Sequence, residues 1–204
     1  RERGPDGEMI LEVNDVFVGH TRLSLLDLSS RSDQPISGNA GTLIFNGEIF
    51  NFKQFGEYPS DTLMLVDKLL KRKLNDDELY SLLNSFNGFF SIVIVYSDET
   101  LLIRDRFGEK PLFWSEDRRV LASSSLESFR TNGYKLHKRR LKNLSKNPFA
   151  YRLISNKGWK TYLKDVYEVP SGSVVKIRDN KNSLNEWYDL NSDIQKYRNS
   201  NPEH

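Results

Sequence analysis

The residues with the most chemical potential in this chain lie in the stretch 42–52, TLIFNGEIFNF, which contains Asn46, Gly47 and Glu48. Apolar and polar residues alternate around Asn46-Gly47, the dipeptide that best tolerates the backbone of a tight two-residue turn. The pattern therefore predicts a β-hairpin over residues 42–52. A hairpin tip is also a good place to fix two hydrogen-bond donors rigidly. Because most Asn-Gly turns do no chemistry, a purely structural hairpin is the alternative interpretation.

The composition of the chain excludes several classes of protein. It contains no cysteine, so disulfides, thiolate metal sites and a thiol nucleophile are absent from this sequence. Lys and Arg number 30 against 28 Asp and Glu, which gives no reason to expect a nucleic-acid or membrane partner for the chain as a whole. No apolar run could cross a bilayer, and the N-terminus lacks the apolar segment of a signal peptide. We expect a cytoplasmic protein with one compact unit and a tail.

Strands are predicted where short β-branched or aromatic runs flank turn residues. The expected hairpins are 9–13 with 16–19, 89–96 with 100–105, 111–114 with 119–123, and a last one within 162–177. Asn14-Asp15 supplies the first turn, and the run Pro170-Ser171-Gly172 supplies the last one.

Two helices are expected between these hairpins. Apolar residues at helical spacing predict a helix over 61–72, with Ser60 or Asp61 as its N-cap. The acidic cluster that opens 75–83 suits a helix N-terminus and predicts a second helix there. The sequence therefore predicts a layered α plus β protein.

The charge pattern and composition divide the chain into four parts. From 130 to 164 every charged residue is basic, which predicts a mobile surface segment that is solvated or faces a partner. A nucleic-acid patch is the weaker alternative, because only His137 and Phe149 lie in or near the densest run, too few aromatic residues for base stacking. The expected parts are a core over 1–129, the basic segment 130–164, a final hairpin and connection over 165–190, and a tail or linker over 191–204.

Seven sequence blocks occur in the order found in the glutaminase half of asparagine synthetase. They are RGPD, GHTRLSLLDLS, QP, FNGEIFN, SDT, NGFF and RDRFGEKPLFW, which together run from Arg3 to Trp114. The chain thus resembles a class II glutamine amidotransferase domain, closely over residues 1–127 and more loosely beyond. This resemblance implies an α+β fold, a four-layer αββα sandwich of the N-terminal-nucleophile hydrolase type, lacking its first strand.

The resemblance also implies roles for five residues in binding and hydrolysing L-glutamine. Arg22 would hold the α-carboxylate through two parallel hydrogen bonds, while Glu48 and Asp61 would accept from the α-ammonium. Asn46 and Gly47 would stabilise the oxyanion through a side-chain amide and a backbone N–H. Each has a structural alternative: a surface salt bridge for Arg22, a helix cap for Asp61 and a plain turn for Asn46-Gly47.

The nucleophile of the family is an N-terminal cysteine, which this sequence does not contain. We therefore expect a glutamine-hydrolysing, ammonia-supplying half of an asparagine synthetase-like protein that is inactive as given, and an enzyme only if the complete chain supplies that cysteine. The expected partner is a synthetase domain in the same or another chain, with a homodimer also allowed. No metal or cofactor is expected in this domain, whereas ATP and Mg would belong to the synthetase domain. The alternative is a non-catalytic glutamine-sensing or partner-docking module.

Overall fold

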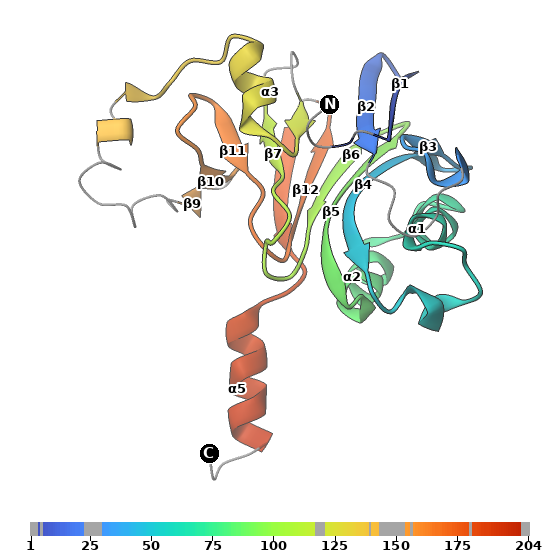
Figure 1. Ribbon diagram of the computed structural model, residues 1–204. Helices are drawn as coiled ribbons and strands as arrows, with labels where there is room; N and C mark the ends of the chain where they lie inside the picture. Colours follow the sequence, from blue (N-terminus) through green and yellow to red (C-terminus); the bar gives the residue numbers. More distant parts are fainter. Residues whose placement is uncertain are drawn as a thin grey trace.

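The computed structural model describes residues 4, 6–22, 30–116, 121–138, 140–142, 154–155, 157–179 and 181–200 (Figure 1). A larger sheet and a smaller sheet pack face to face, and helices lie on their outer sides. A separate hairpin of β1 (Gly7–Val13) and β2 (Val16–Arg22) lies beside the larger sheet. This is the four-layer αββα arrangement that the family resemblance implies.

The larger sheet is antiparallel and has the strand order β13-β12-β6-β5-β4-β3. Its strands are β3 Ile36–Ser37, β4 Gly41–Ile49, β5 Gly88–Tyr96, β6 Thr100–Arg104, β12 Ser173–Arg178 and β13 Lys181–Glu186. The edge strand β3 pairs with β4 only at Leu43 and Thr42, so the rest of that edge of β4 lies beyond the end of β3.

The smaller sheet is also antiparallel and has the order β8-β7-β11-β10-β9. Its strands are β7 Phe113–Ser115, β8 Ala122–Ser123, β9 Ile154–Ser155, β10 Gly158–Lys160 and β11 Val166–Glu168. The pairing of β7 with β8 confirms the hairpin predicted there, although residues 117–120 of its connection lie outside the described residues.

The helices begin at side chains that cap them. α1 (Asp61–Leu70) starts at Ser60, whose Oγ accepts from the Leu63 N–H, so the serine and not Asp61 is the N-cap. α2 (Asp76–Ser85) starts with a capping box between Asn75 and Glu78. Shorter helices include η1 Ser30–Ser32, η2 Phe52–Phe55 and α3 Leu126–Thr131. Both long helices predicted from the sequence are thus confirmed.

Three apolar clusters fill the three interfaces between layers, because side chains on a strand alternate between its faces. Ile92 and Ile94 of β5 pack with α1 and α2, whereas Val93 packs in the cluster between the sheets. On β7, Trp114 joins that inter-sheet cluster, and Phe113 packs in a third cluster with Phe129 of α3. The period-two pattern of the strands therefore explains the layered core.

The hairpin predicted over 42–52 is wrong, because β4 runs without a turn from Gly41 to Ile49. Asn46 and Gly47 pair with Ser91 and Phe90 in the middle of the β4-β5 ladder. Gly47 does have a positive φ angle, 151°, but it adopts this angle inside the strand and not in a turn. A long apolar partner in β5 therefore outweighs the local turn preference.

The last predicted hairpin is also wrong, because β11 and β12 belong to different sheets. The turn around Gly172 exists, with φ 62°, but it carries the chain from the smaller sheet to the larger one. β12 pairs instead with β13 and β6. The hairpins β1-β2 and β5-β6 are confirmed, and the first turns at Asn14-Asp15 with both φ angles positive.

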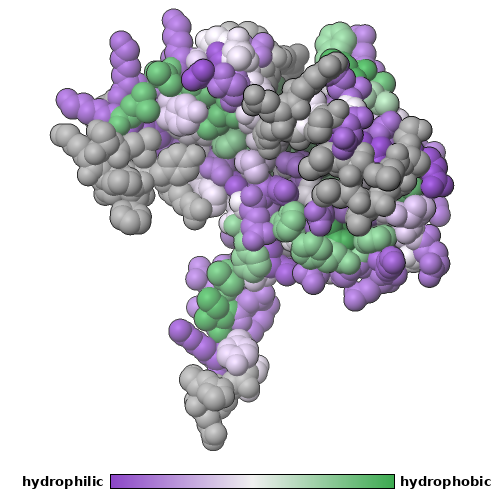
Figure 2. Space-filling view, viewed as in Figure 1, coloured by the Kyte–Doolittle hydropathy of each residue, from purple (hydrophilic) through white to green (hydrophobic). Residues whose placement is uncertain are grey.

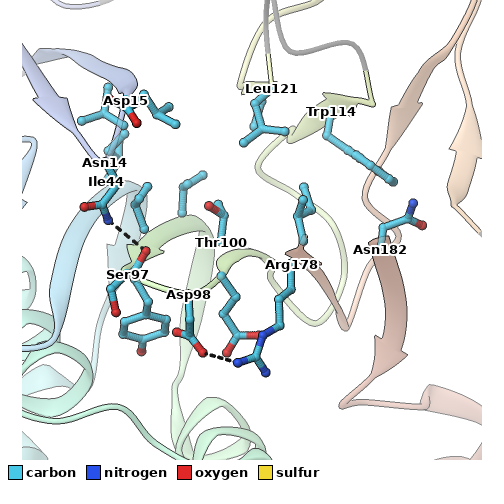
Figure 3. Close-up of a pocket in the computed structure, with 18 of the residues that line it drawn as sticks. Asn14, Asp15, Ile44, Ser97, Asp98, Thr100, Trp114, Leu121, Arg178 and Asn182 are labelled. Atoms are coloured by element: carbon cyan, nitrogen blue, oxygen red, sulfur yellow. Dashed lines mark hydrogen bonds and ion pairs between the residues drawn. The ribbon is translucent and has the colours of Figure 1, made fainter. Parts of the chain in front are cut away.

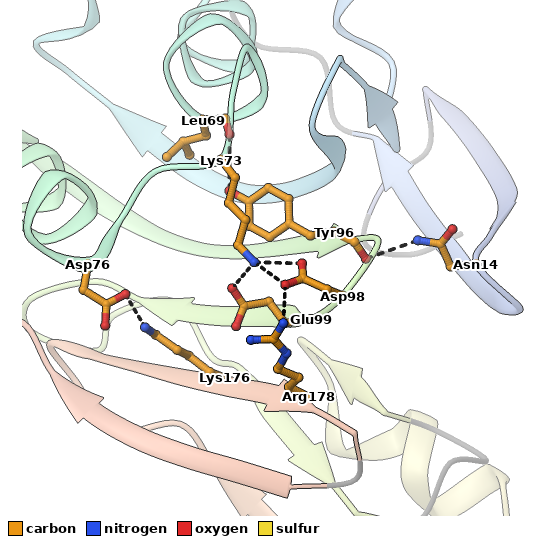
Figure 4. A network of polar contacts seen from close by, with 9 residues as sticks. All are labelled: Asn14, Leu69, Lys73, Asp76, Tyr96, Asp98, Glu99, Lys176 and Arg178. Carbon is orange, nitrogen blue, oxygen red and sulfur yellow. Dashed lines mark hydrogen bonds and ion pairs between the residues drawn. The ribbon is translucent and has the colours of Figure 1, made fainter.

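A polar network ties the helical layer to the end of the larger sheet (Figure 4). Lys73, which follows α1, pairs with Asp98 and Glu99 at 2.7 Å each, and Arg178 of β12 pairs with Asp98 at 3.0 Å. The Asn14 side chain donates to the Tyr96 carbonyl, which fixes the β1-β2 hairpin against the same corner. The side chains of Lys73 and Asp98 are both more than a third exposed. Each ion pair of this network therefore contributes little alone.

The helix α5 (Leu190–Ser200) extends away from the sandwich, and none of its residues is buried (Figure 1). Asp189 caps it by accepting from the N–H groups of Asn191 and Ser192. Leu190, Ile194 and Tyr197 are exposed along it, and apolar residues are visible on its surface in Figure 2. The tail predicted from composition over 191–204 is therefore helical up to residue 200.

Candidate functional site

The outer edge of β4 presents backbone N–H groups next to the predicted oxyanion residues. The Phe45 N–H donates to Gln34 Oε1 at 2.5 Å, and the Ile49 N–H donates to Asp61 Oδ2 at 3.0 Å. Since N–H groups of alternate residues point to the same side of a strand, the Gly47 N–H points to this edge as well. In the described part of the chain, no acceptor bonds to it. The edge therefore offers one open donor between two satisfied ones.

Glycine is the only residue type that fits at position 47 of β4. A Cβ there would lie 2.1 Å from the Phe89 carbonyl oxygen and 2.7 Å from the Phe90 Cα. The φ angle of 151° is also one that residues with side chains rarely adopt. The strand can thus bring this backbone close to its neighbours, or to a ligand, only because the side chain is missing.

Asn46 and Glu48 project from the opposite face of β4 to Phe45 and Ile49, which pack in the core beneath the helices. Both polar side chains are half-buried, and among the described residues no hydrogen bond or ion pair engages either one. An amide and a carboxylate therefore lie two residues apart on one face, available to a ligand.

Asp61 joins the start of α1 to the end of β4. Its carboxylate accepts from the Ile49 N–H at 3.0 Å and from the Thr62 N–H at 2.7 Å, and the residue is 5% exposed. Burial raises the pKa of Asp61 above its ordinary value, and the charge of Glu48 raises it further, although the two N–H donors act in the opposite direction. The two acidic side chains are therefore close enough for electrostatic repulsion between them.

Arg22, at the end of β2, forms an ion pair through Nη1 with Asp33 Oδ1. The arginine side chain is 12% exposed and the aspartate 34%. Burial lowers the pKa of nearby His20, and the Arg22 charge lowers it further, which keeps the imidazole neutral near pH 7. A guanidinium is thus held at the edge of the protein beside a carboxylate that can reach solvent.

The structure places four of the five sequence-predicted site residues on two touching elements. Asn46, Gly47 and Glu48 lie on β4, and Asp61 lies on α1, bonded to the last residue of that strand. Arg22 comes from the separate β1-β2 hairpin, which also contacts β4. Sequence reasoning did not identify Asp33 as a partner of Arg22, and its only signal was its place just before Gln34-Pro35.

The block RDRFGEKPLFW has a structural role that joins the two sheets. Arg104 is 4% exposed; its guanidinium donates to Glu168 Oε1 of β11 and to the Val169 carbonyl, at 2.6 Å each. Asp105 accepts from the backbone N–H groups of Phe90, Phe107, Glu109 and Lys110. The block therefore fixes a loop and an inter-sheet ion pair.

A cleft of about 900 Å³ opens between the β1-β2 hairpin and the inner faces of the two sheets (Figure 3). Ile44 and Thr100 line it from the larger sheet, and Trp114 lines it from the smaller one. None of the five predicted site residues lines this cleft. Among the described residues, no group of three His, Cys, Asp or Glu could hold a metal ion, and no helix is long and apolar enough for a membrane span.

The amino-acid sequence of this chain is similar to those of several known proteins. A family model described as a glutamine amidotransferase domain matches residues 1–188. The chain is 25% identical to amidase chry2 of Gibberella zeae over 88% of its length. It is 28% identical to a putative asparagine synthetase (glutamine-hydrolyzing) of Methanocaldococcus jannaschii over 61% of its length, and 29% identical to asparagine synthetase 2 of Bacillus subtilis over 81%. The chain spans 27%, 29% and 20% of these relatives.

Solved structures share the fold at low sequence identity. One, described as the allosteric regulatory enzyme of purine biosynthesis, has a TM-score of 0.60 at 17% identity, over 84% of this chain and 35% of that chain. Another, the glutamine phosphoribosylpyrophosphate amidotransferase of B. subtilis, has a TM-score of 0.56 at 18% identity, again over 84% and 35%. The four-layer sandwich of this chain is therefore the fold that these two solved structures have.

Proposed function

Because this chain belongs to the glutamine amidotransferase domain family, we propose that it is the glutamine-hydrolysing, ammonia-supplying part of an asparagine synthetase-like protein. The observation that carries the proposal is the edge of β4. There the Gly47 N–H is open while its neighbours on the same edge are satisfied, and the Asn46 side chain is without a partner among the described residues.

These two donors suit the oxyanion that forms when a nucleophile attacks the glutamine amide. The attack moves an electron pair onto the carbonyl oxygen, and donors fixed before the reaction stabilise that charge best. The Gly47 N–H is fixed by the strand, and the Asn46 side chain leaves the next residue of the same strand. Collapse of the intermediate would then break the C–N bond and release ammonia, the leaving nitrogen taking the proton lost by the nucleophile, and water would hydrolyse the acyl group left on the nucleophile.

The remaining residues suit the two charged ends of free glutamine. Arg22 would hold the α-carboxylate, because a planar guanidinium can donate two parallel hydrogen bonds to it. Glu48 and Asp61 would accept from the α-ammonium, whose positive charge offsets the repulsion between the two acids. Recognition of both ends would restrict the site to α-amino acids.

The nucleophile and the acceptor chemistry complete the proposal from outside this sequence. The sequence has no cysteine, so hydrolysis would need an N-terminal cysteine on a further strand, and the chain as given would bind glutamine without hydrolysing it. A synthetase domain in the same or another chain would bind ATP and Mg and use the ammonia. A homodimer and a cytoplasmic location are parts of the same proposal.

An ammonia-release assay, combined with calorimetric binding of L-glutamine, tests this function. We expect the 204-residue chain to bind glutamine without turnover, and the same chain preceded by a strand that begins with cysteine to release ammonia. Asn46→Ala in that extended chain should lower kcat about a hundredfold or more, since one oxyanion donor is lost. Asn182→Ala, which removes a surface bond to Glu116, should leave kcat unchanged.

The absence of cysteine also favours one alternative function, a non-catalytic module that senses glutamine or docks a partner. Tight glutamine binding by the extended chain with no ammonia release would support that alternative. Lack of glutamine binding by both chains would rule out the proposed site.

A further inference from the structure

The backbone around Asp33 is fixed on both sides by contacts to elements of the proposed glutamine site. Ser32 Oγ lies 2.9 Å from Ser60 Oγ, the N-cap of α1, and both serines are buried. Gln34 is 7% exposed, and its Oε1 accepts from the Phe45 N–H on the edge of β4. The main chain of Asp33 therefore cannot shift without breaking buried contacts.

The side chain of Asp33 is less constrained than its backbone. It contacts Arg22 through one oxygen and one guanidinium nitrogen, and it is 34% exposed, whereas the arginine is 12% exposed. Rotation about its own side-chain bonds would move the carboxylate into water. There it would pay no desolvation penalty. Arg22 is the more buried partner and would remain in place.

We propose that Asp33 is a positioning residue, which holds the Arg22 guanidinium in the free protein and gives way to the α-carboxylate of glutamine. This inference rests on the proposed function of the site. The incoming carboxylate can form two parallel hydrogen bonds, which makes it the stronger ligand for a guanidinium. The exchange leaves the charge around Arg22 unchanged, so the buried cation is never left without an anion.

Calorimetric titration of the 204-residue chain with L-glutamine and with L-glutaminamide, in which the α-carboxylate is an amide, tests this exchange. Asp33→Asn keeps the shape and an acceptor oxygen but removes the competing charge. We expect it to bind glutamine about threefold to fivefold more tightly, as fits loss of a partly exposed ion pair. Binding of glutaminamide should not tighten, because it brings no carboxylate to Arg22.

A matched control is Asp98→Asn, which removes an ion-paired aspartate of similar exposure, 36%, from the Lys73 network. It should leave the affinity for both ligands unchanged. Asp33→Ser also removes the charge and must shift glutamine affinity in the same direction as Asp33→Asn, with folding checked by circular dichroism.

Three outcomes would overturn the inference. A purely structural Asp33 would make both ligands bind more weakly in the folded variants, and an unchanged glutamine affinity would show that Asp33 does not compete. If the unaltered chain fails to bind glutamine at all, the proposed function fails first, and this inference fails with it.

Discussion

At the scale of single residues, Asp61 is the clearest electrostatic feature of the site. Its carboxylate is buried, and Glu48 adds repulsion, so its pKa is raised despite two backbone donors. A raised acid pKa means that the native state binds more protons than the unfolded state above the ordinary value of 3.8. The contribution of Asp61 is therefore most favourable at low pH and declines as pH rises.

Asp61→Asn should remove that pH dependence. As pH rises from about 3.8 towards neutrality, the unfolding free energy of the unaltered chain should fall relative to that of the variant. A constant offset of about 1 kcal/mol is expected, because an amide cannot accept from both N–H groups. Urea unfolding at a series of pH values measures the difference, and an opposite slope would contradict the raised pKa.

The sequence alone was enough to nominate the residues of the proposed site, but not to predict their contacts. Asn46, Gly47, Glu48 and Asp61 fall in short blocks that resemble a known family, and α1 and β4 bring them together. The bond from the Phe45 N–H to Gln34 could not be predicted, because a side chain there replaces a strand partner in the ladder. Such a contact depends on tertiary structure alone.

At the scale of elements, β4 shows how pairing overrides a local turn signal. Asn46-Gly47 fits a tight turn, yet β4 pairs continuously with the apolar strand β5. Its alternate residues, including Phe45 and Ile49, fill the core under α1 and α2. A turn in the middle would disrupt both the ladder and this burial.

Gly47→Ala tests the need for a close approach inside this strand. The new Cβ would meet the Phe89 carbonyl at 2.1 Å on a backbone with φ 151°, so we expect a loss of about 3 kcal/mol or more in unfolding free energy. Gly7→Ala in β1 is the matched control, since its nearest neighbour would lie 4.0 Å away. Urea denaturation of both variants decides the matter, and equal stabilities would contradict the packing described.

At the scale of the whole molecule, Arg104 and Glu168 couple the two sheets. The arginine lies on β6 and the glutamate on β11, and their side chains are 5% and 12% exposed. The chain crosses between these sheets at the turn before β12, which a sequence pattern cannot distinguish from a hairpin turn. Long-range pairing of this kind is therefore visible only in the folded molecule.

Arg104→Met should destabilise the sandwich by about 3–5 kcal/mol, because Glu168 would be left buried without its counter-ion. Arg178→Met, which removes a surface partner of Asp98, should cost about 0.5 kcal/mol or less. Thermal unfolding measured by calorimetry compares the two. A small effect at Arg104 would mean that the two sheets are held by their apolar cluster alone.

The exposed helix α5 has almost no packing contact that would tie its folding to that of the sandwich. It has 11 residues and buries none of them, and helices shorter than about 12–15 residues are marginal in water without tertiary support. We therefore expect fraying of this helix to leave the sandwich intact. Binding of another surface to Leu190, Ile194 and Tyr197 should therefore raise the helical content of residues 190–200 without changing the stability of the sheets.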